Sequence, residues 1–261
     1  MDVKLLETMA DSLRAARRNR TPIKTLTETY PDFTVADAYK VQLLNVEREL
    51  NQGRRIIGKK IGLTSRGMQQ MLGVSEPDYG VLLDDMIFEA GSPISLGRLI
   101  QPKIEAEIAF VLKKRLKGPG VTLLQVLQAT EGVVPAFEII DSRIEKWKIK
   151  LADTVADNAS GAGIVPGDVL TAVKNIDLKT VGMVLEHNGV MAATAAGAEV
   201  LGHPALAVAW LANKLAEYDQ SLEPGEIILS GALTKAWGIA SGDVFRASFG
   251  GLGSVKAKFV A

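Results

Sequence analysis

Cysteine is absent from this 261-residue sequence, and histidine occurs only twice, as His187 and His203. The absence of cysteine excludes disulfides, thiolate nucleophiles and cysteine-ligated zinc or iron–sulfur sites. Two histidines argue against a metal site built from several imidazoles. A metal in this protein would therefore be held mainly by oxygen atoms, which favours magnesium, manganese or calcium.

Charge of one sign is not in excess either, because 30 basic and 30 acidic residues cancel. Nucleic acids and acidic membranes attract proteins with surplus positive charge, so neither is an expected partner. The longest apolar runs are too short to span a bilayer. The first 20 residues alternate apolar and charged side chains at helical spacing, unlike a signal peptide, and their acidic residues argue against a transit peptide. These features predict a cytoplasmic protein.

The first third of the chain has mostly helical patterns. Thr34 and Asp37 form a helix-start capping pair ahead of a buried apolar stripe, and Asn51–Gly53 ends that helix. The elements predicted next are a strand or extended segment at Arg55–Leu63, a short helix at Ser65–Leu72 and a turn at Glu76–Gly80.

Strand patterns dominate the rest of the sequence. Asn188–Gly189 between apolar residues is the strongest short hairpin signal, and Pro135 favours an edge or a bulge for the strand around it. The predicted strands and hairpin are Ile104–Leu112, Val133–Ile140, Met183–Ala192, Glu226–Ser230, Val244–Phe249 and Ser254–Val260, and helices are predicted from Thr122 to about Glu131 and from Pro204 onward. We therefore predict an α+β protein, with a helical portion at residues 1–75 and a mixed-β portion at residues 76–261 in one integrated domain.

Glu105 and Glu107 lie in the sequence Lys103-Ile-Glu-Ala-Glu107 within a predicted strand. Side chains two residues apart share one face of a strand, so both carboxylates point the same way. They repel each other, and a divalent cation would remove the repulsion. A solvated strand face would give the same pattern, and that alternative stays open for this pair alone.

Glu138 is the one charged residue in the apolar run Val133–Ile140. A carboxylate in such a run is costly to bury unless it is paired or binds a metal. Glu138 is therefore a candidate for the same site as the glutamate pair. An ion pair with Arg143 or with a lysine is the alternative.

Lys59 and Lys60 lie in the glycine-punctuated segment Gly58–Ser65, where glycines allow a ligand to approach the backbone. A lysine in an apolar extended segment can have a lowered pKa and act as an acid or base. The alternative is two exposed lysines on a strand. Weaker candidates, which a simple turn or loop would also explain, are Asp78, Asp157, Asn158 and Ser160.

Six segments, spread in order along nearly the whole chain, form a specific combination. They are GKKIGLTS (58–65), PDYG (77–80), QPKIEAEIAFVL (101–112), FEIIDSRIEKWKIK (137–150), DTVADNAS (153–160) and LGHP (201–204). This combination resembles the 2-oxopent-4-enoate hydratase and 4-oxalocrotonate decarboxylase family, a branch of the fumarylacetoacetate-hydrolase-like superfamily. The resemblance implies a helical N-terminal portion followed by a mixed β-roll, a homo-oligomer, and catalysis that depends on magnesium or manganese.

The resemblance also implies roles for single residues. The implied metal ligands are Glu105, Glu107 and Glu138. The implied catalytic residues are Lys60, for acid–base work on the substrate, and Asp78 and Ser160, which place a proton or water. The implied substrate is a small 2-oxo or 2-hydroxy dienoic acid.

Two reactions run in this family, both in the meta-cleavage degradation of aromatic compounds. Hydratases add water to 2-hydroxypenta-2,4-dienoate, giving 4-hydroxy-2-oxopentanoate, whereas decarboxylases release carbon dioxide from 2-oxohex-3-enedioate (4-oxalocrotonate). PDYGVLLDDM (77–86) and WKIKLADTVADNAS (147–160) look more like the hydratase branch, while ILSGALTKAWGIASGD (228–243) is intermediate. The resemblance thus favours a hydratase, with a decarboxylase as the alternative, and a complex with the paired enzyme is compatible with either.

Two rival classes stay open. A non-enzymatic binding protein for a 2-oxo acid would keep the metal and the pocket. A fumarylacetoacetate-type hydrolase that cleaves carbon–carbon bonds would want a histidine near the site as a base. His187, in the predicted hairpin, and His203, at a helix entry, lie far along the chain and lower the odds of that reaction.

Overall fold

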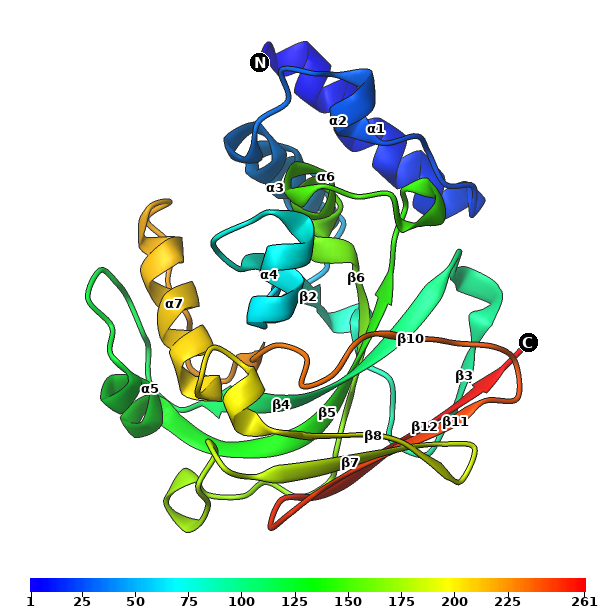
Figure 1. Cartoon of the computed structure of the whole chain (residues 1–261). Coiled ribbons are helices and arrows are strands. Elements are labelled where there is room, and N and C mark those ends of the chain that lie inside the picture. The colour runs from blue at the N-terminus through cyan, green and yellow to red at the C-terminus, as the bar shows by residue number, and fades with distance from the viewer.

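Helices near the N-terminus pack together on one side of the β-sheets (Figure 1). The structure, a computed structural model, describes the backbone of all 261 residues and every side chain except those of Met71 and Leu72. The N-terminal helices are α1 (Val3–Asn19), α2 (Leu26–Thr29) and α3 (Val35–Asn51). The hydroxyl of Thr34 accepts a hydrogen bond from the amide of Asp37, so the predicted capping pair at the start of α3 is confirmed.

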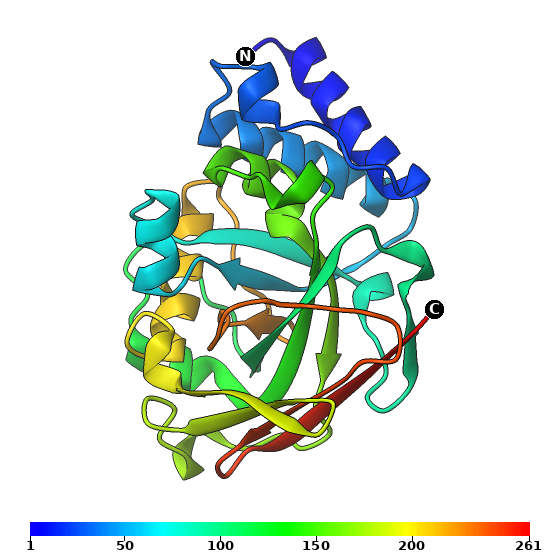
Figure 2. The same ribbon diagram turned by 45° about the vertical axis from the view of Figure 1, so that its right-hand side comes forward.

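The larger sheet has the strand order β2-β1-β9-β4-β5-β6, and β10 pairs with β4 outside this row. Its strands are β1 (Ile56–Gly62), β2 (Asp78–Leu83), β4 (Pro102–Leu112), β5 (Thr130–Asp141), β6 (Gly161–Pro166), β9 (Ile227–Leu229) and β10 (Trp237–Gly238). β1 and β9 run parallel, while β1–β2, β4–β5, β4–β9, β4–β10 and β5–β6 are antiparallel. Figure 2 shows the strong twist of these strands, with α6 lying above them.

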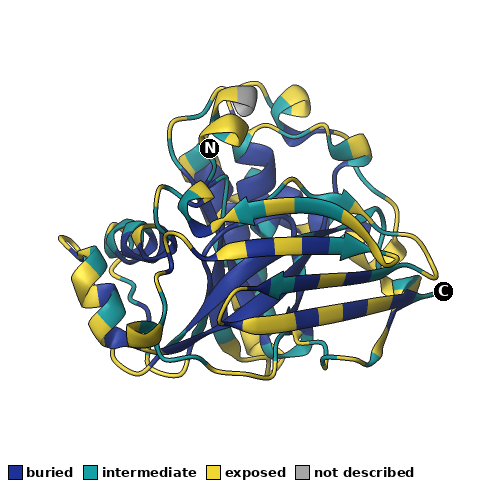
Figure 3. Cartoon of the chain, turned by 60° about the horizontal axis from the view of Figure 1, so that its bottom comes forward, coloured by how far each residue is buried: buried dark blue, intermediate teal, exposed yellow. Residues whose placement is uncertain are grey.

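The smaller sheet has the order β3-β12-β11-β7-β8. Its strands are β3 (Pro93–Ser95), β7 (Gly182–His187), β8 (Val190–Ala196), β11 (Val244–Phe249) and β12 (Gly253–Val260). Between β7 and β8, Asn188 and Gly189 have φ angles of 53° and 80°, so the predicted hairpin is confirmed. On the face seen in Figure 3, exposed residues alternate with buried ones along these strands.

The apolar core lies between the two sheets and decides which face of the larger sheet is left for chemistry. Phe245 and Phe259 of the smaller sheet belong to the same buried cluster as Phe137 and Ile139 of β5. Ile104 of β4 belongs to it too. Because successive strand residues alternate between faces, the residues between these positions point away from the smaller sheet.

Four more helices lie around the larger sheet: α4 (Arg66–Leu72), α5 (Leu123–Ala129), α6 (Leu151–Ala156) and α7 (Pro204–Ala216). The predicted capping box of Thr122 and Gln125 opens α5, which ends two residues before the prediction because Thr130 begins β5. Short 3-10 turns are found at Asp84–Met86, Leu96–Arg98, Glu145–Trp147, Asn158–Ser160, Val173–Asn175 and Gly197–Glu199.

The predicted turn at Glu76–Gly80 is wrong for its second half. The strand β2 begins at Asp78, which pairs with Gly62 of β1. The proline and glycine that suggested a turn sit instead before the strand and within it. A partner strand fixes this segment as extended, and no local pattern in the sequence reports that partner.

The expectation that Pro135 marks an edge strand or bulge is also wrong, because β5 lies between β4 and β6. The ladder with β6 ends at the pair Ala136–Pro166, one residue away. The carbonyl of Pro135 accepts the amide of Gly167. A strand residue points its amide and its carbonyl toward the same neighbouring strand. The N–H that Pro135 lacks would therefore have pointed toward β6, at the end of the β5–β6 ladder.

The predicted α+β class is confirmed, with a helical N-terminus followed by mixed sheets of the β-roll type. The division at residues 75 and 76 stays a proposal, and β1, which precedes it, is a strand of the larger sheet. Within the described part of the chain, no helix combines the length and apolarity needed to cross a membrane.

Candidate metal centre

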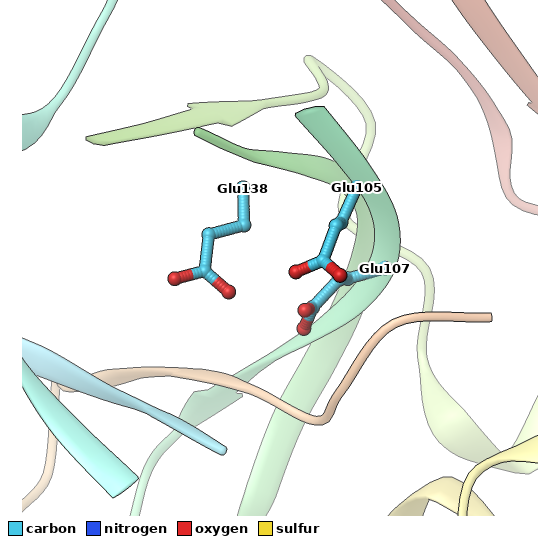
Figure 4. A group of neighbouring side chains, drawn as sticks. All are labelled: Glu105, Glu107 and Glu138. Atoms are coloured by element: carbon cyan, nitrogen blue, oxygen red, sulfur yellow. The ribbon is translucent and has the colours of Figure 1, made fainter. Parts of the chain in front are cut away.

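Three glutamates from neighbouring strands face one another on the larger sheet (Figure 4). Glu105 and Glu107 lie on β4, and Glu138 on β5 stands directly opposite Glu105 in the antiparallel register. Opposed residues of two strands share one face, so the register brings the third carboxylate to the predicted pair. One carboxylate oxygen of each glutamate lies within 4.8 Å of the other two.

The three carboxylates lie in the protein interior, so a solvated strand face is the wrong interpretation of the glutamate pair. Glu107 and Glu138 are each 1% exposed, and Glu105 is half-buried. Burial raises the pKa of Glu138 to about 8. Burial, together with repulsion by Glu138 and Glu105, raises the pKa of Glu107 well above its ordinary value. These shifts express the cost of holding negative charges together without a cation.

The bonding of these carboxylates fits a hard divalent cation. Neither oxygen of Glu138 accepts a hydrogen bond from a described residue, although both are buried. Glu107 accepts one hydrogen bond, from the amide of Gly231, at 2.8 Å. Three carboxylates with unused lone pairs are the oxygen donors that magnesium prefers.

Lys60 on β1 is buried beside this cluster. Its Nζ lies 3.3 Å from Oε1 of Glu138 and donates to the carbonyl of Ala159 at 2.9 Å. The lysine is 3% exposed, so the alternative of an exposed lysine is wrong. The sequence left open an ion pair of Glu138 with Arg143 or with a lysine. Glu138 pairs with Lys60, and Arg143 pairs with Asp157 instead.

The expectation of a lowered pKa for Lys60 is wrong as well. Burial alone lowers the pKa of this ammonium, but the surrounding carboxylates, Glu138 first, outweigh burial and raise it above its ordinary value. Lys60 is therefore held in its charged form. Its neighbour Lys59 points elsewhere and pairs with Glu226 at 2.6 Å.

Asp78 on β2 lies close to Lys60, because β1 and β2 place both side chains on one face. Lys60 pairs with Gly80, and Asp78 pairs with Gly62. Oδ2 of Asp78 accepts a hydrogen bond from the hydroxyl of Thr154 at 3.2 Å, and Oδ1 has no partner among the described residues. Burial raises the pKa of Asp78.

Ser160 ends a turn with an uncommon backbone. Asn158, Ala159 and Ser160 have φ angles of 56°, 48° and 53°. Left-handed conformations are costly for residues other than glycine and persist where the surroundings fix them. The next residue, Gly161, lies so close to the cluster that an added Cβ would be 3.7 Å from Oε1 of Glu138.

Two sets of contacts fix this turn. The guanidinium of Arg143 donates to the carboxylate and the carbonyl of Asp157 and to the carbonyl of Gly161. The side-chain amide of Asn158 binds both the amide and the carbonyl of Val81 on β2, at 2.8 and 2.9 Å. The hydroxyl of Ser160 donates to Asp157 at 3.3 Å. The turn therefore presents the Ala159 carbonyl to Lys60 in one defined arrangement.

The structure thus brings Lys60, Asp78 and the three glutamates together from β1, β2, β4 and β5. Ser160 lies in the adjacent turn before β6, and its hydroxyl contacts Asp157. Sequence reasoning indicated the glycines of Gly58–Ser65 and the polar residues of Val155–Ser160, but it missed Thr154 and the ion pair of Asp157 with Arg143. A cavity of about 770 Å³ lies between α1, α3 and residues 83–99, and it is also lined by Arg143, Asp157, Asn158 and Gly161 of this turn.

The two histidines do not join the cluster. His187 pairs with Asp243 at 2.8 Å and stacks on Phe245 in the smaller sheet. His203 caps the start of α7, where its Nδ1 accepts the amide of Ala205. A carbon–carbon hydrolase that uses a histidine base is therefore not favoured.

Comparison with known proteins identifies the family. The profile of the fumarylacetoacetate (FAA) hydrolase C-terminal family matches residues 60–260. The chain belongs to this family. The resemblance seen in the sequence is thereby confirmed.

Full-length relatives narrow the chemistry within the family. The chain is 47% identical over 253 residues to a 2-keto-4-pentenoate hydratase of Paraburkholderia xenovorans LB400, covering 97% of this chain and 94% of that protein. It is 43% identical over 252 residues to a 4-oxalocrotonate decarboxylase of Pseudomonas sp. CF600, covering 97% and 96%. Both kinds of relative are lyases, and this FAA hydrolase family member is a lyase of the same kind.

A solved structure agrees over the whole length. The 4-oxalocrotonate decarboxylase of Pseudomonas putida G7, complexed with magnesium and adipate, superposes with a TM-score of 0.97 at 40% identity, covering 100% of this chain and 99% of that one. This agreement confirms the expected fold type. It also makes magnesium the metal to test first in the glutamate cluster.

Proposed function

We propose that this chain is a metal-dependent hydratase that adds water to 2-hydroxypenta-2,4-dienoate and releases 4-hydroxy-2-oxopentanoate. The reaction belongs to the meta-cleavage degradation of aromatic compounds and would take place in the cytoplasm. The observation that carries the proposal is the convergence of three carboxylates, two of them buried, with Lys60, Asp78 and the Ser160 turn. The 47% identity to a 2-keto-4-pentenoate hydratase supports the choice of substrate.

In this proposal Glu105, Glu107 and Glu138 hold a magnesium or manganese ion. The bound ion supplies Lewis-acid stabilisation of negative charge on the oxygens of a 2-oxo acid. Magnesium is supported by the similar decarboxylase structure that contains it. Manganese is supported by the oxygen-only donor set, which suits either ion.

Lys60 is the acid–base residue of the proposal. It is buried, it donates to the carbonyl of Ala159, and its Nζ lies 3.3 Å from Oε1 of Glu138, so it is placed beside the ion site where it can give or take a proton. Hydration needs a proton at C5 of the dienol as the 2-hydroxyl loses its own, which gives an α,β-unsaturated ketone. Water then adds at C4, and C3 takes up the second proton of that water.

Asp78 and Ser160 position the water and its protons. The unpartnered Oδ1 of Asp78 is available to accept a hydrogen bond from water, while Thr154 fixes the other oxygen of this carboxylate. The hydroxyl of Ser160 donates to Asp157, which leaves its lone pairs as acceptors. Both side chains are buried, so the water they hold is separated from bulk solvent.

Decarboxylation of 2-oxohex-3-enedioate is the second candidate. It is favoured by the superposition on a 4-oxalocrotonate decarboxylase over the full chain and by 43% identity to another. The same ion and the same lysine would serve either reaction, so the site residues alone do not discriminate between them. A homo-oligomer, and a complex with the enzyme of the paired reaction, belong to the proposal through the family resemblance.

The test is to offer the purified protein both substrates with magnesium, following loss of the dienol and release of carbon dioxide together. We expect loss of the dienol without carbon dioxide. Glu105→Gln and Glu107→Gln should each remove most turnover with the fold intact, whereas Glu131→Gln, an exposed glutamate of β5, should not. Near-wild-type rates in both site variants would refute the assignment, and carbon dioxide release would favour the second candidate.

A further inference from the structure

The strand that carries Asp78 has one edge that no other strand covers, because β2 is the last strand in the row of the larger sheet. Backbone groups of alternate residues point toward such an edge and need partners when they are buried. Two side-chain amides supply them. Nε2 of Gln42 donates to the carbonyl of Tyr79 at 2.9 Å, and Asn158 binds both the amide and the carbonyl of Val81. Side chains thus take the place of a further strand beside β2.

Gln42 also binds the helix that packs against its own helix. It lies on α3, which packs against α6 (Figures 1 and 2). The same Nε2 donates to the carbonyl of Val155 in the last turn of α6 at 3.0 Å. The oxygen of this amide, Oε1, is buried and has no hydrogen-bond partner among the described residues. Gln42 therefore serves as a donor only, and its two hydrogen bonds join β2 to α6.

Each of the two carbonyls that Gln42 binds belongs to the neighbour of a residue at the site. Tyr79 directly follows Asp78, and Val155 directly follows Thr154. The hydroxyl of Thr154 donates to Oδ2 of Asp78 at 3.2 Å, and all of these side chains are buried. The contacts form a closed ring from Gln42 through β2 to Asp78, and back through Thr154 and α6. The hydrogen bonds of Gln42 therefore fix the separation of the two backbones that the Thr154–Asp78 contact spans.

We propose that Gln42 and Thr154 are positioning residues that act together on Asp78. Gln42 holds β2 and α6 at the separation that lets the hydroxyl of Thr154 orient the Asp78 carboxylate. This inference rests on the proposed function, in which Asp78 positions water. Gln42 lies ahead of residues 60–260, the part of the chain that matches the family profile. The N-terminal helical portion thus contributes to the geometry of the site without supplying a metal ligand or an acid–base group.

The test measures kcat and KM for dienol hydration, thermal unfolding and magnesium affinity in matched variants. Gln42→Met keeps the length of the side chain but removes both donors, and Thr154→Val removes one hydroxyl. A displacement of up to about 1 Å in a positioned group costs up to about 100-fold in rate, so kcat should fall by about 10- to 100-fold in each variant. KM and the affinity for magnesium should change by less than about 3-fold, because the glutamate cluster is not touched. Thr154→Ser keeps the hydroxyl and should restore most of the rate.

A double-variant comparison tests whether the two residues act through Asp78. In protein that already carries Asp78→Asn, Gln42→Met and Thr154→Val should each lower kcat by less than about 3-fold, because effects within one network are not additive. Glu105→Gln should lower the rate further in that background, which shows that the remaining turnover comes from the site.

Asn45 provides a matched control. It lies on α3 as well, but its side-chain amide donates to the carbonyl of Ala10 at 3.2 Å and so joins α3 to α1. Asn45→Leu should therefore keep wild-type kcat.

Wild-type kcat in Gln42→Met would overturn the proposal, and so would a loss of rate that is as large in the Asp78→Asn background. A parallel loss of rate, stability and magnesium affinity would also overturn it, because Gln42 would then support the whole fold and not Asp78. If Gln42→Met does not fold, Thr154→Val decides, and wild-type kcat in that variant would overturn the proposal. Failure of the proposed function has a different signature, since wild-type protein would then not consume the dienol.

Discussion

A single methyl group at Gly62 should disable the site while leaving the fold in place. A Cβ added to Gly62 would lie 2.2 Å from Oδ1 of Asp78 and 3.3 Å from Nζ of Lys60. Ordinary contacts begin at 3.4 Å, so the Asp78 carboxylate must move by more than about 1 Å. Because the clash is with the end of a side chain and not with backbone, the strand pairing can persist.

The size of the effect follows from these distances. A displacement of about 1 Å in a positioned catalytic group costs about 100-fold in rate, so kcat of Gly62→Ala should fall by about that factor. Crowding of a packed site costs about 1–3 kcal/mol, partly offset by the reduced entropy of the unfolded chain when glycine is replaced. The melting temperature should therefore fall by no more than about 10 °C.

Two other glycines serve as controls in the same assay of dienol hydration and thermal unfolding. At Gly58 an added Cβ would lie 1.8 Å from the backbone oxygen of Ile227, so Gly58→Ala should lose stability and activity together. At Gly67 in α4 it would meet nothing within 4 Å, so Gly67→Ala should behave like wild type. Wild-type kcat in Gly62→Ala, at unchanged stability, would refute the role given to the position of Asp78.

Three further outcomes follow from the site. Lys60→Met should lower kcat by about 10²- to 10⁴-fold, the usual loss of an acid–base group, and a rate within 3-fold of wild type, roughly, would exclude Lys60 from proton transfer. Arg143→Met leaves Asp157 buried without its cation, so the free energy of unfolding should fall by about 3–5 kcal/mol in thermal or urea denaturation. A loss below about 1 kcal/mol would contradict the stabilising role given to the Arg143–Asp157 ion pair. Removal of metal by a chelator should abolish turnover, and magnesium should restore it; activity that survives chelation would count against a metal-dependent reaction.

Much of the fold is readable from the sequence because its signals are local. The capping pair at Thr34, the box at Thr122 and the turn at Asn188–Gly189 each depend on residues within four positions, and all three are present. The shared face of Glu105 and Glu107 follows from strand periodicity in the same way. Glu138 stood out because a charge interrupts an apolar run.

The rest of the site depends on pairing between distant segments, which no local pattern reports. The register of β4 with β5 places Glu138 opposite Glu105, and a shift of one residue would turn Glu138 to the other face. The raised pKa of Lys60 comes from carboxylates on three other strands. The apolar neighbours of Lys60 in the sequence predict a lowered pKa instead, because they do not reveal those carboxylates. The sequence pattern around Asp78 predicts a turn because its strand partner, Gly62, lies in a distant segment, β1, and the pairing cannot be read from neighbouring residues.

The central claim is that Glu105, Glu107 and Glu138 together hold one divalent cation. The most direct test is a calorimetric titration of the metal-free protein with magnesium. Wild-type protein and Glu131→Gln should bind one ion per chain with equal affinity. Glu138→Gln should weaken binding by at least about 100-fold, since loss of even an outer-shell partner costs about 10- to 100-fold. Unchanged affinity and stoichiometry in Glu138→Gln, and in the variant with all three glutamates replaced by glutamine, would contradict the account.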